Sequence, residues 1–199
     1  MSETASISGP DWGSDSWGDH DFATVLDAAK DGQEWAWQLL FRRFAGPVTG
    51  YVTGRGSPDP EDTAGETLLQ VARNIHGFEG DEDSFRSWVF VIAHRRMIDA
   101  RRASSRRPVL RPLESAPDRS SASETEDEVI GSLLSPDMVE ALAAITDTQR
   151  EVLLLRTVAD LSLEDVAKIL GKRVGAIKGL QRRGLTALRD HLERRGVSP

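Results

Sequence analysis

The basic side chains between residues 171 and 189 form the part of the sequence best suited to a defined chemistry, the binding of nucleic acid. Lys178 and Arg182 are spaced one helical turn apart, and no Asp or Glu occurs within 171–189. Lysine and arginine at this spacing pair with phosphates and with the O6 and N7 edge of guanine. A merely solvated helix face would carry interspersed acids, so the pattern favours DNA binding.

These side chains require an element that presents them together. A short amphipathic stretch over 162–170, a tight turn over 171–173 and a longer helix from Val174 to about Leu192 have helix-turn-helix spacing. Two glycines share the outer face of the longer helix, where a missing side chain lets another backbone approach closely. The residues expected to bind duplex DNA are therefore Lys172, Arg173, Gly175, Lys178, Gly179, Arg182 and Arg183.

A second basic segment, in the N-terminal half, lies beside aromatic residues. Residues 86–111 hold eight arginines and one acid. Bases parted from a duplex stack on aromatic side chains beside arginines, and each stacked base contributes about 1–3 kcal/mol of binding free energy. The alternative is that the aromatics are core, which we expect of Trp88, whereas Phe78 in a Gly-flanked loop is the better base-contacting candidate. The candidates for holding parted strands are Phe78, Arg86, Phe90, Arg95, Arg96, Arg101 and Arg102.

Composition excludes several function classes. The chain of 199 residues has a net charge of −7 and no cysteine, so it has no thiolate nucleophile or thiolate zinc site. The four histidines are scattered, and no nucleophile elbow or phosphate-binding glycine loop occurs, so we expect no catalysis, metal or cofactor. No apolar run approaches the roughly 18 residues of a membrane span, and the acidic N-terminus is no signal peptide, so we expect a cytoplasmic protein without membrane insertion.

The charges are sorted into alternating blocks. Residues 1–34 and 112–140 each sum to −7, whereas 86–111 and 168–195 each sum to +7. A basic stripe indicates nucleic-acid binding even in an acidic chain. We hypothesise that the acidic stretches reduce DNA binding by the free protein, although solvated helix faces are the plainer interpretation of the basic blocks.

Helical periodicity occurs throughout and β alternation is absent, which predicts an all-α fold of two small helical domains. Helix starts are predicted at Asp59-Pro60, Ser135-Pro136, Thr146 and Ser162, and a kink or short break is predicted near Pro47. We expect four parts: a disordered acidic extension over 1–20, a helical bundle over 21–107, a flexible acidic linker over 108–134 and a helix-turn-helix domain over 135–199. Trp12 and Trp17 of the extension are either incidental or dock elsewhere.

Two independent stretches resemble the extracytoplasmic-function sigma factors of bacterial RNA polymerase. In the C-terminal half, residues 146–156, 161–171 and 174–178 match the order and spacing of that family's helix-turn-helix domain. In the N-terminal half, residues 59–69 resemble its polymerase-clamp helix and residues 85–102 its promoter-melting helix. Gly65 departs from the family pattern, which has glutamine there, and 179–183 departs from it as well.

The resemblance implies a sigma factor that binds RNA polymerase core enzyme and directs promoter recognition, DNA melting and transcription initiation. Residues 135–199 would bind the minus-thirty-five duplex and residues 78–102 the melted minus-ten strand. Polymerase would be bound by Asp59, Glu61, Asp62, Glu66 and Leu69. An anti-sigma factor is a further expected partner. The alternative is a stand-alone helix-turn-helix regulator whose N-terminal half is an effector or dimerisation module.

Overall fold

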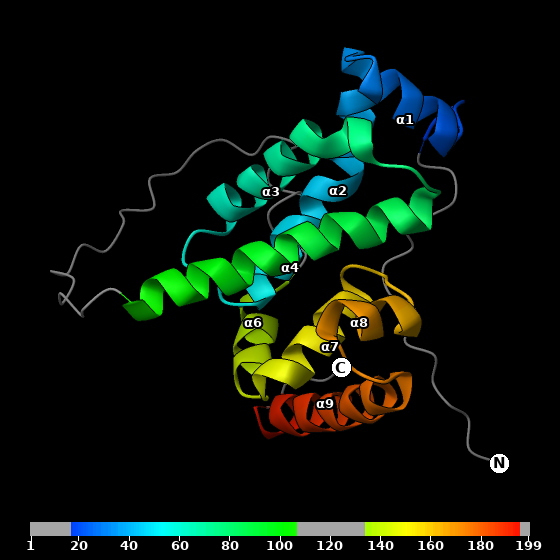
Figure 1. The fold of residues 1–199 in the computed structure, drawn as a ribbon. Coiled ribbons are helices and arrows are strands. Elements are labelled where there is room, and N and C mark those ends of the chain that lie inside the picture. The colour runs from blue at the N-terminus through cyan, green and yellow to red at the C-terminus, as the bar shows by residue number, and fades with distance from the viewer. Residues whose placement is uncertain (1–16, 107–133, 196–199) are drawn as a thin grey trace, which may run out of the picture.

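The computed structural model describes residues 17–106 and 134–195, and within these it describes the side chains of 17–102 and 134–195. The described parts are helical, as the sequence predicts, and none of their helices is long and apolar enough to cross a membrane. The predicted linker lies almost wholly outside the described residues. Figure 1 shows the N-terminal helices above and the C-terminal helices below the long helix α4.

The N-terminal domain is built from four α-helices and a short 3-10 turn. Helix α1 (Phe22–Lys30) and helix α2 (Glu34–Gly54) are separated at Gly32, which has φ of 75°. Helix α3 (Pro60–Asn74) continues into the 3-10 turn η1 (Ile75–Gly77). Helix α4 (Glu82–Arg106) carries Phe85, Trp88 and Phe90 and six of the eight arginines of the second basic segment.

Of the kink or short break predicted near Pro47, the break is absent: α2 continues through the proline to Gly54. A proline inside a helix removes one backbone hydrogen bond and its ring crowds the carbonyl one turn earlier, which together cost about 3 kcal/mol. Val48, Tyr51 and Val52, beyond the proline, are each fully buried. Burial of these side chains offsets the lost bond and keeps the helix intact.

The C-terminal domain contains helices α6 (Pro136–Ala143), α7 (Asp147–Thr157), α8 (Leu163–Leu170) and α9 (Val174–Arg194). The predicted starts are confirmed by side-chain caps: Ser135 accepts from the Met138 amide, Ser162 from the Asp165 amide, and Thr146 forms a capping box with Gln149. These caps satisfy backbone amides that have no partner within the helix.

The turn between α8 and α9 depends on Gly171. This residue has φ of 61° and caps α8 in the left-handed conformation, which a residue with a side chain adopts only at a cost. The sharp turn brings α9 across α8 in the predicted helix-turn-helix arrangement.

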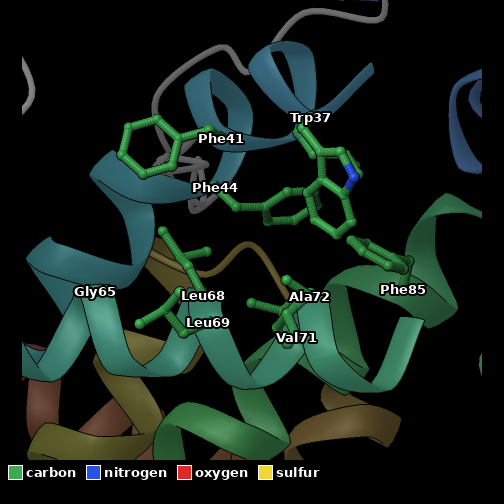
Figure 2. A pocket seen from close by; sticks show the side chains of 11 residues that line it. Trp37, Phe41, Phe44, Gly65, Leu68, Leu69, Val71, Ala72 and Phe85 are labelled. Atoms are coloured by element: carbon green, nitrogen blue, oxygen red, sulfur yellow. The ribbon is translucent and has the colours of Figure 1, made fainter. Parts of the chain in front are cut away.

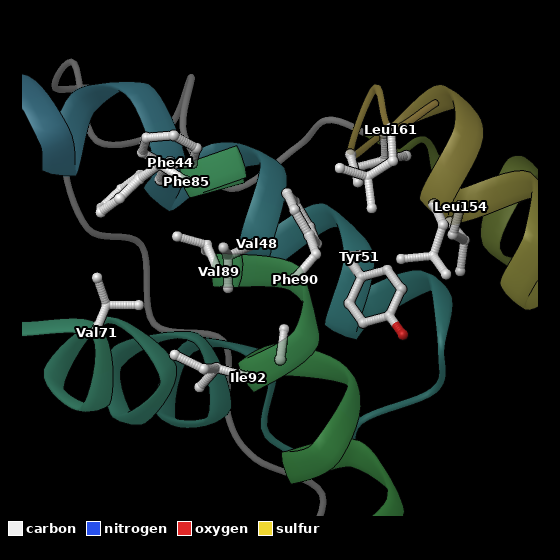
Figure 3. Packing of buried hydrophobic residues seen from close by; sticks show 14 of the residues in the cluster. Phe44, Val48, Tyr51, Val71, Phe85, Val89, Phe90, Ile92, Leu154 and Leu161 are labelled. Atoms are coloured by element: carbon white, nitrogen blue, oxygen red, sulfur yellow. The ribbon is translucent and has the colours of Figure 1, made fainter. Parts of the chain in front are cut away.

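One hydrophobic core runs through both domains. Phe44, Phe85 and Phe90 form its N-terminal part, and Leu154 and Leu161 extend it into the C-terminal domain (Figure 3). The two halves therefore pack directly on each other.

Candidate nucleic-acid and protein interfaces

Helix α9 presents a cationic outer face. The basic residues predicted to bind duplex DNA are all exposed, and within the described parts of the chain none of them forms a salt bridge. On the opposite face Ile177 is fully buried, and Leu180, Leu185 and Leu188 pack against the core. The apolar stripe therefore fixes the rotation of the helix and turns the cations outward.

The two glycines of this face leave the backbone open. A Cβ atom placed on Gly175 would meet no atom within 4 Å, and one on Gly179 would meet only the guanidinium group of Arg183. Each glycine lowers helix stability by about 1 kcal/mol relative to alanine. The open face can approach a flat or grooved partner more closely than one covered by side chains.

The candidates for strand binding divide into two groups. Phe78, Arg86 and Phe90 are buried, with 8%, 6% and 0% of their surface exposed. The remaining candidates are surface arginines of α4, namely Arg95, Arg96, Arg101 and Arg102. Only the second group is accessible in this arrangement.

The three buried candidates have packing partners. Phe78 packs edge-on against Phe85, with ring centroids 5.0 Å apart. Phe90 packs edge-on against Tyr51 at 5.6 Å, and the Arg86 guanidinium lies 5.8 Å from the centre of the Phe44 ring. The loop position of Phe78 was the reason to expect exposure, but the aromatic cluster draws its ring inward. Trp88, expected in the core, is half-buried against this cluster.

The surface arginines of α4 are partly engaged with carboxylates. Arg96 pairs with Glu66 of α3, which joins a strand-binding candidate to a polymerase-binding candidate. Arg102 lies 3.7 Å from Asp99 one turn earlier. Ion pairs at exposed positions are weak, at about 0–1 kcal/mol, so an incoming phosphate can displace them.

The start of α4 makes a polar contact that no sequence pattern marks. Residues 17–20, placed in the disordered extension, form a turn, and Trp17 is only 4% exposed. Its indole Nε1 donates to Glu82 Oε2 over 2.8 Å, and Arg43 donates to the other oxygen of Glu82 over 2.8 Å. Burial raises the pKa of Glu82, but these bonds outweigh it and leave the pKa below its ordinary value. No periodic signal marks Trp17, since it precedes the first helix.

The polymerase-binding candidates lie along α3. Asp59 is the cap of the helix and accepts from the Asp62 amide over 3.1 Å. Glu61, Asp62 and Glu66 are exposed, and the Leu69 side chain is 55% exposed. These acidic side chains and Leu69 are therefore accessible to a partner.

The two domains meet at a carboxylate that the sequence does not mark. Glu151 of α7 lies 2.8 Å from Nδ1 of His94 in α4 and 3.2 Å from Arg55. These three side chains are only 8–13% exposed. Burial, with the charge of Glu151 nearby, raises the pKa of Tyr51, whose hydroxyl lies 3.4 Å from His94.

Close packing accompanies these charges. Gly54 is the last residue of α2, and a Cβ there would lie 2.5 Å from a terminal methyl of Leu154, so a larger residue would force that buried side chain to shift. Farther along α4, Arg101 is 2.5 Å from Asp147 of α7. One strand-binding candidate is thus held by the C-terminal domain, while α9 lies beyond α7 and α8 as seen from α4 (Figure 1).

Each half of the chain matches a known protein family. Residues 40–107 match the family model for Sigma-70 region 2, and residues 141–190 match that for Sigma-70, region 4. The chain is 33% identical over 134 residues to ECF RNA polymerase sigma factor ShbA of Streptomyces griseus, covering 65% of this chain and 69% of ShbA. It is 28% identical over 166 residues to ECF RNA polymerase sigma factor BldN of Streptomyces coelicolor, covering 82% of this chain and 63% of BldN.

A solved structure shares the fold. The sigma factor RpoE in complex with the anti-sigma factor NepR from Bartonella quintana aligns with a TM-score of 0.52 and 20% identity. The alignment covers 86% of this chain and 93% of that one. Both helical domains are therefore present in a protein of known structure.

Proposed function

Because this chain belongs to the extracytoplasmic-function sigma factors, which bind RNA polymerase and direct promoter recognition, we propose how its surfaces divide that task. Helix α9 binds the minus-thirty-five duplex through its exposed basic face. The arginines of α4 hold the melted minus-ten strand. The exposed face of α3 contacts the polymerase core.

The observation that carries this proposal is the uncompensated positive charge of α9. Lys178 and Arg182 are exposed, lack carboxylate partners within the described residues, and stand beside open glycine backbone. Phosphate contacts through such side chains position a helix, and contacts to base edges give specificity.

The buried aromatics have a supporting role in this proposal. The sequence made Phe78 and Phe90 candidates for base contacts, but both rings are buried. Their role in this proposal is to pack α4 against the core, which fixes the direction in which its arginines point. A base captured by Phe78 would require the loop over 78–84 to move away from Phe85.

Run-off transcription with core polymerase on a genomic promoter library tests the proposal. Addition of the chain should yield transcripts from a defined promoter set, and core polymerase alone should not. A gel shift without polymerase separates this function from that of a stand-alone regulator, which would bind its sites unaided. The family match over 40–107 disfavours that alternative.

We further propose an anti-sigma protein as a third partner, by analogy with the complex of RpoE and NepR. Co-purification of the chain from its own cells tests this. Chemistry belongs to the polymerase in this scheme, so the chain acts without a catalytic site of its own, in the cytoplasm where promoters and polymerase meet.

A further inference from the structure

An apolar groove on the N-terminal domain is not part of either DNA-binding surface. It encloses about 370 Å³ between α2, α3 and the start of α4, and almost no polar atom lines it. Figure 2 shows Trp37, Phe41 and Phe44 on one side, with Leu68 and Leu69 on the other. Phe41 on the rim is 53% exposed. Apolar patches of this kind mark binding sites for other apolar groups.

The described chain begins beside this groove. Trp17 packs on Phe22 with ring centroids 5.6 Å apart, and Phe22 packs on Phe85 at 5.4 Å. Phe85 lines the groove. The ring of His20 also lies on Trp35 of α2, with centroids 4.6 Å apart. Two ring contacts, from Trp17 to Phe22 and from Phe22 to Phe85, therefore connect the start of the described chain to the wall of the groove.

The segment over 1–16 contains a side chain suited to the groove. Trp12 precedes Trp17 by five residues, and five extended residues span up to about 17 Å. This reach exceeds the two centroid separations, 5.6 Å and 5.4 Å, that connect Trp17 to Phe85 through Phe22. The indole of tryptophan offers a large apolar surface for burial.

The charges at the groove also fit this segment. Asp11 precedes Trp12, and Asp15 follows it. Arg42 is exposed and lines the surface next to Trp37 and Phe41. A carboxylate beside the indole would lie near this guanidinium group.

Gly65 keeps the groove open on the α3 side. It lines the groove, and a Cβ atom placed there would meet no atom within 4 Å. A larger side chain would project into free space without disturbing the helix. The groove can therefore be filled by substitution while the fold is retained.

We propose that the N-terminal segment folds back over α2 and α3 and places Trp12 in this groove. Leu69 belongs both to the groove and to the surface proposed to contact polymerase. The docked segment therefore competes with polymerase for α3, a consequence that rests on the proposed function.

Cysteine cross-linking tests the docking without polymerase, because the chain has no native cysteine. A Gly13→Cys/Leu69→Cys chain should form its disulfide about tenfold faster than a Gly13→Cys/Lys178→Cys chain. Adding Trp12→Ser should remove the difference. Equal rates in the two pairs, or no effect of Trp12→Ser, would overturn the proposal.

A filled groove gives an independent test. Gly65→Phe should abolish the preferential cross-link, and Gly175→Phe, at an equally open helical glycine, should leave it intact. Circular dichroism establishes that both variants are folded. Persistence of the cross-link in a folded Gly65→Phe chain would contradict docking in the groove.

Polymerase affinity tests the competition separately. Deletion of residues 2–14 should tighten binding to core polymerase about tenfold, equivalent to about 1.4 kcal/mol. Unchanged affinity despite the cross-link overturns the competition. Failure of the full chain to bind polymerase at all would instead contradict the proposed function.

Discussion

Glu151 of α7 lies 2.8 Å from the Nδ1 atom of His94 in α4, and this contact joins the C-terminal domain to the helix proposed to hold melted DNA. The same carboxylate lies 3.2 Å from Arg55 at the end of α2. Three elements from two domains thus share one buried charge cluster. In this arrangement direct packing between the domains holds the two proposed DNA-binding surfaces relative to each other.

Glu151→Gln should destabilise this arrangement. Loss of the carboxylate leaves Arg55 largely buried without its opposite charge, which costs about 3 kcal/mol, the lower end for breaking a buried ion pair. Urea denaturation of the full chain measures the change. Glu164→Gln, at an exposed position in α8, is the control and should stay within about 0.5 kcal/mol. Equal stability of both variants would contradict a structural role for the cluster.

Arg182→Ala should weaken promoter binding without affecting the fold. The side chain is exposed, so stability should change by less than about 0.5 kcal/mol. If Arg182 contacts a base, the complex of the variant with polymerase should bind promoter DNA about 1–3 kcal/mol more weakly. If it contacts a phosphate, the slope of log affinity against log salt concentration should fall by about one. Lys178→Ala should behave alike. Arg194→Ala, at the far end of α9, is the matched control, and equal losses in all three would show that the contact face is misplaced.

Arg101→Ala and Asp147→Asn should have opposite effects on DNA. The two side chains form a salt bridge, and both are substantially exposed, so either change should cost at most about 1 kcal/mol of stability. Arg101→Ala should weaken DNA binding, because it removes a phosphate contact. Asp147→Asn should strengthen DNA binding, because it frees Arg101 to contact a phosphate. Binding of a single-stranded minus-ten oligonucleotide by the complex with polymerase measures both. A decrease in both variants would indicate that the bridge itself positions α4.

Glu82→Gln should flatten the acid dependence of stability. The pKa of Glu82 is lowered in the folded chain, so its contribution is present above the ordinary value of 4.5 and is lost as the pH falls through the folded pKa. The free energy of unfolding of the parent chain should therefore fall more steeply below about pH 5 than that of the variant. Glu79→Gln, in the exposed loop before α4, is the control. Parallel curves would contradict this role for the Trp17 and Arg43 contacts.

Local sequence signals predicted most helix boundaries. Asp59, Ser135, Thr146 and Ser162 each cap a helix where expected, because a cap depends on residues within one turn of it. The exception is Pro47, where burial of the following turn overrides the local preference for a break. The outward cations of α9 were predictable for a similar reason, since the apolar period of one helix sets its rotation.

What the sequence by itself determined is the set of helices, their caps and the charged face of α9. Only the tertiary structure decided that Trp17 binds Glu82, that Phe90 is buried against Tyr51, and that Glu151 joins the two domains. These contacts connect residues far apart in the chain, and each depends on how whole helices pack. A pattern within one helix specifies which face is buried, but not which distant side chain covers it.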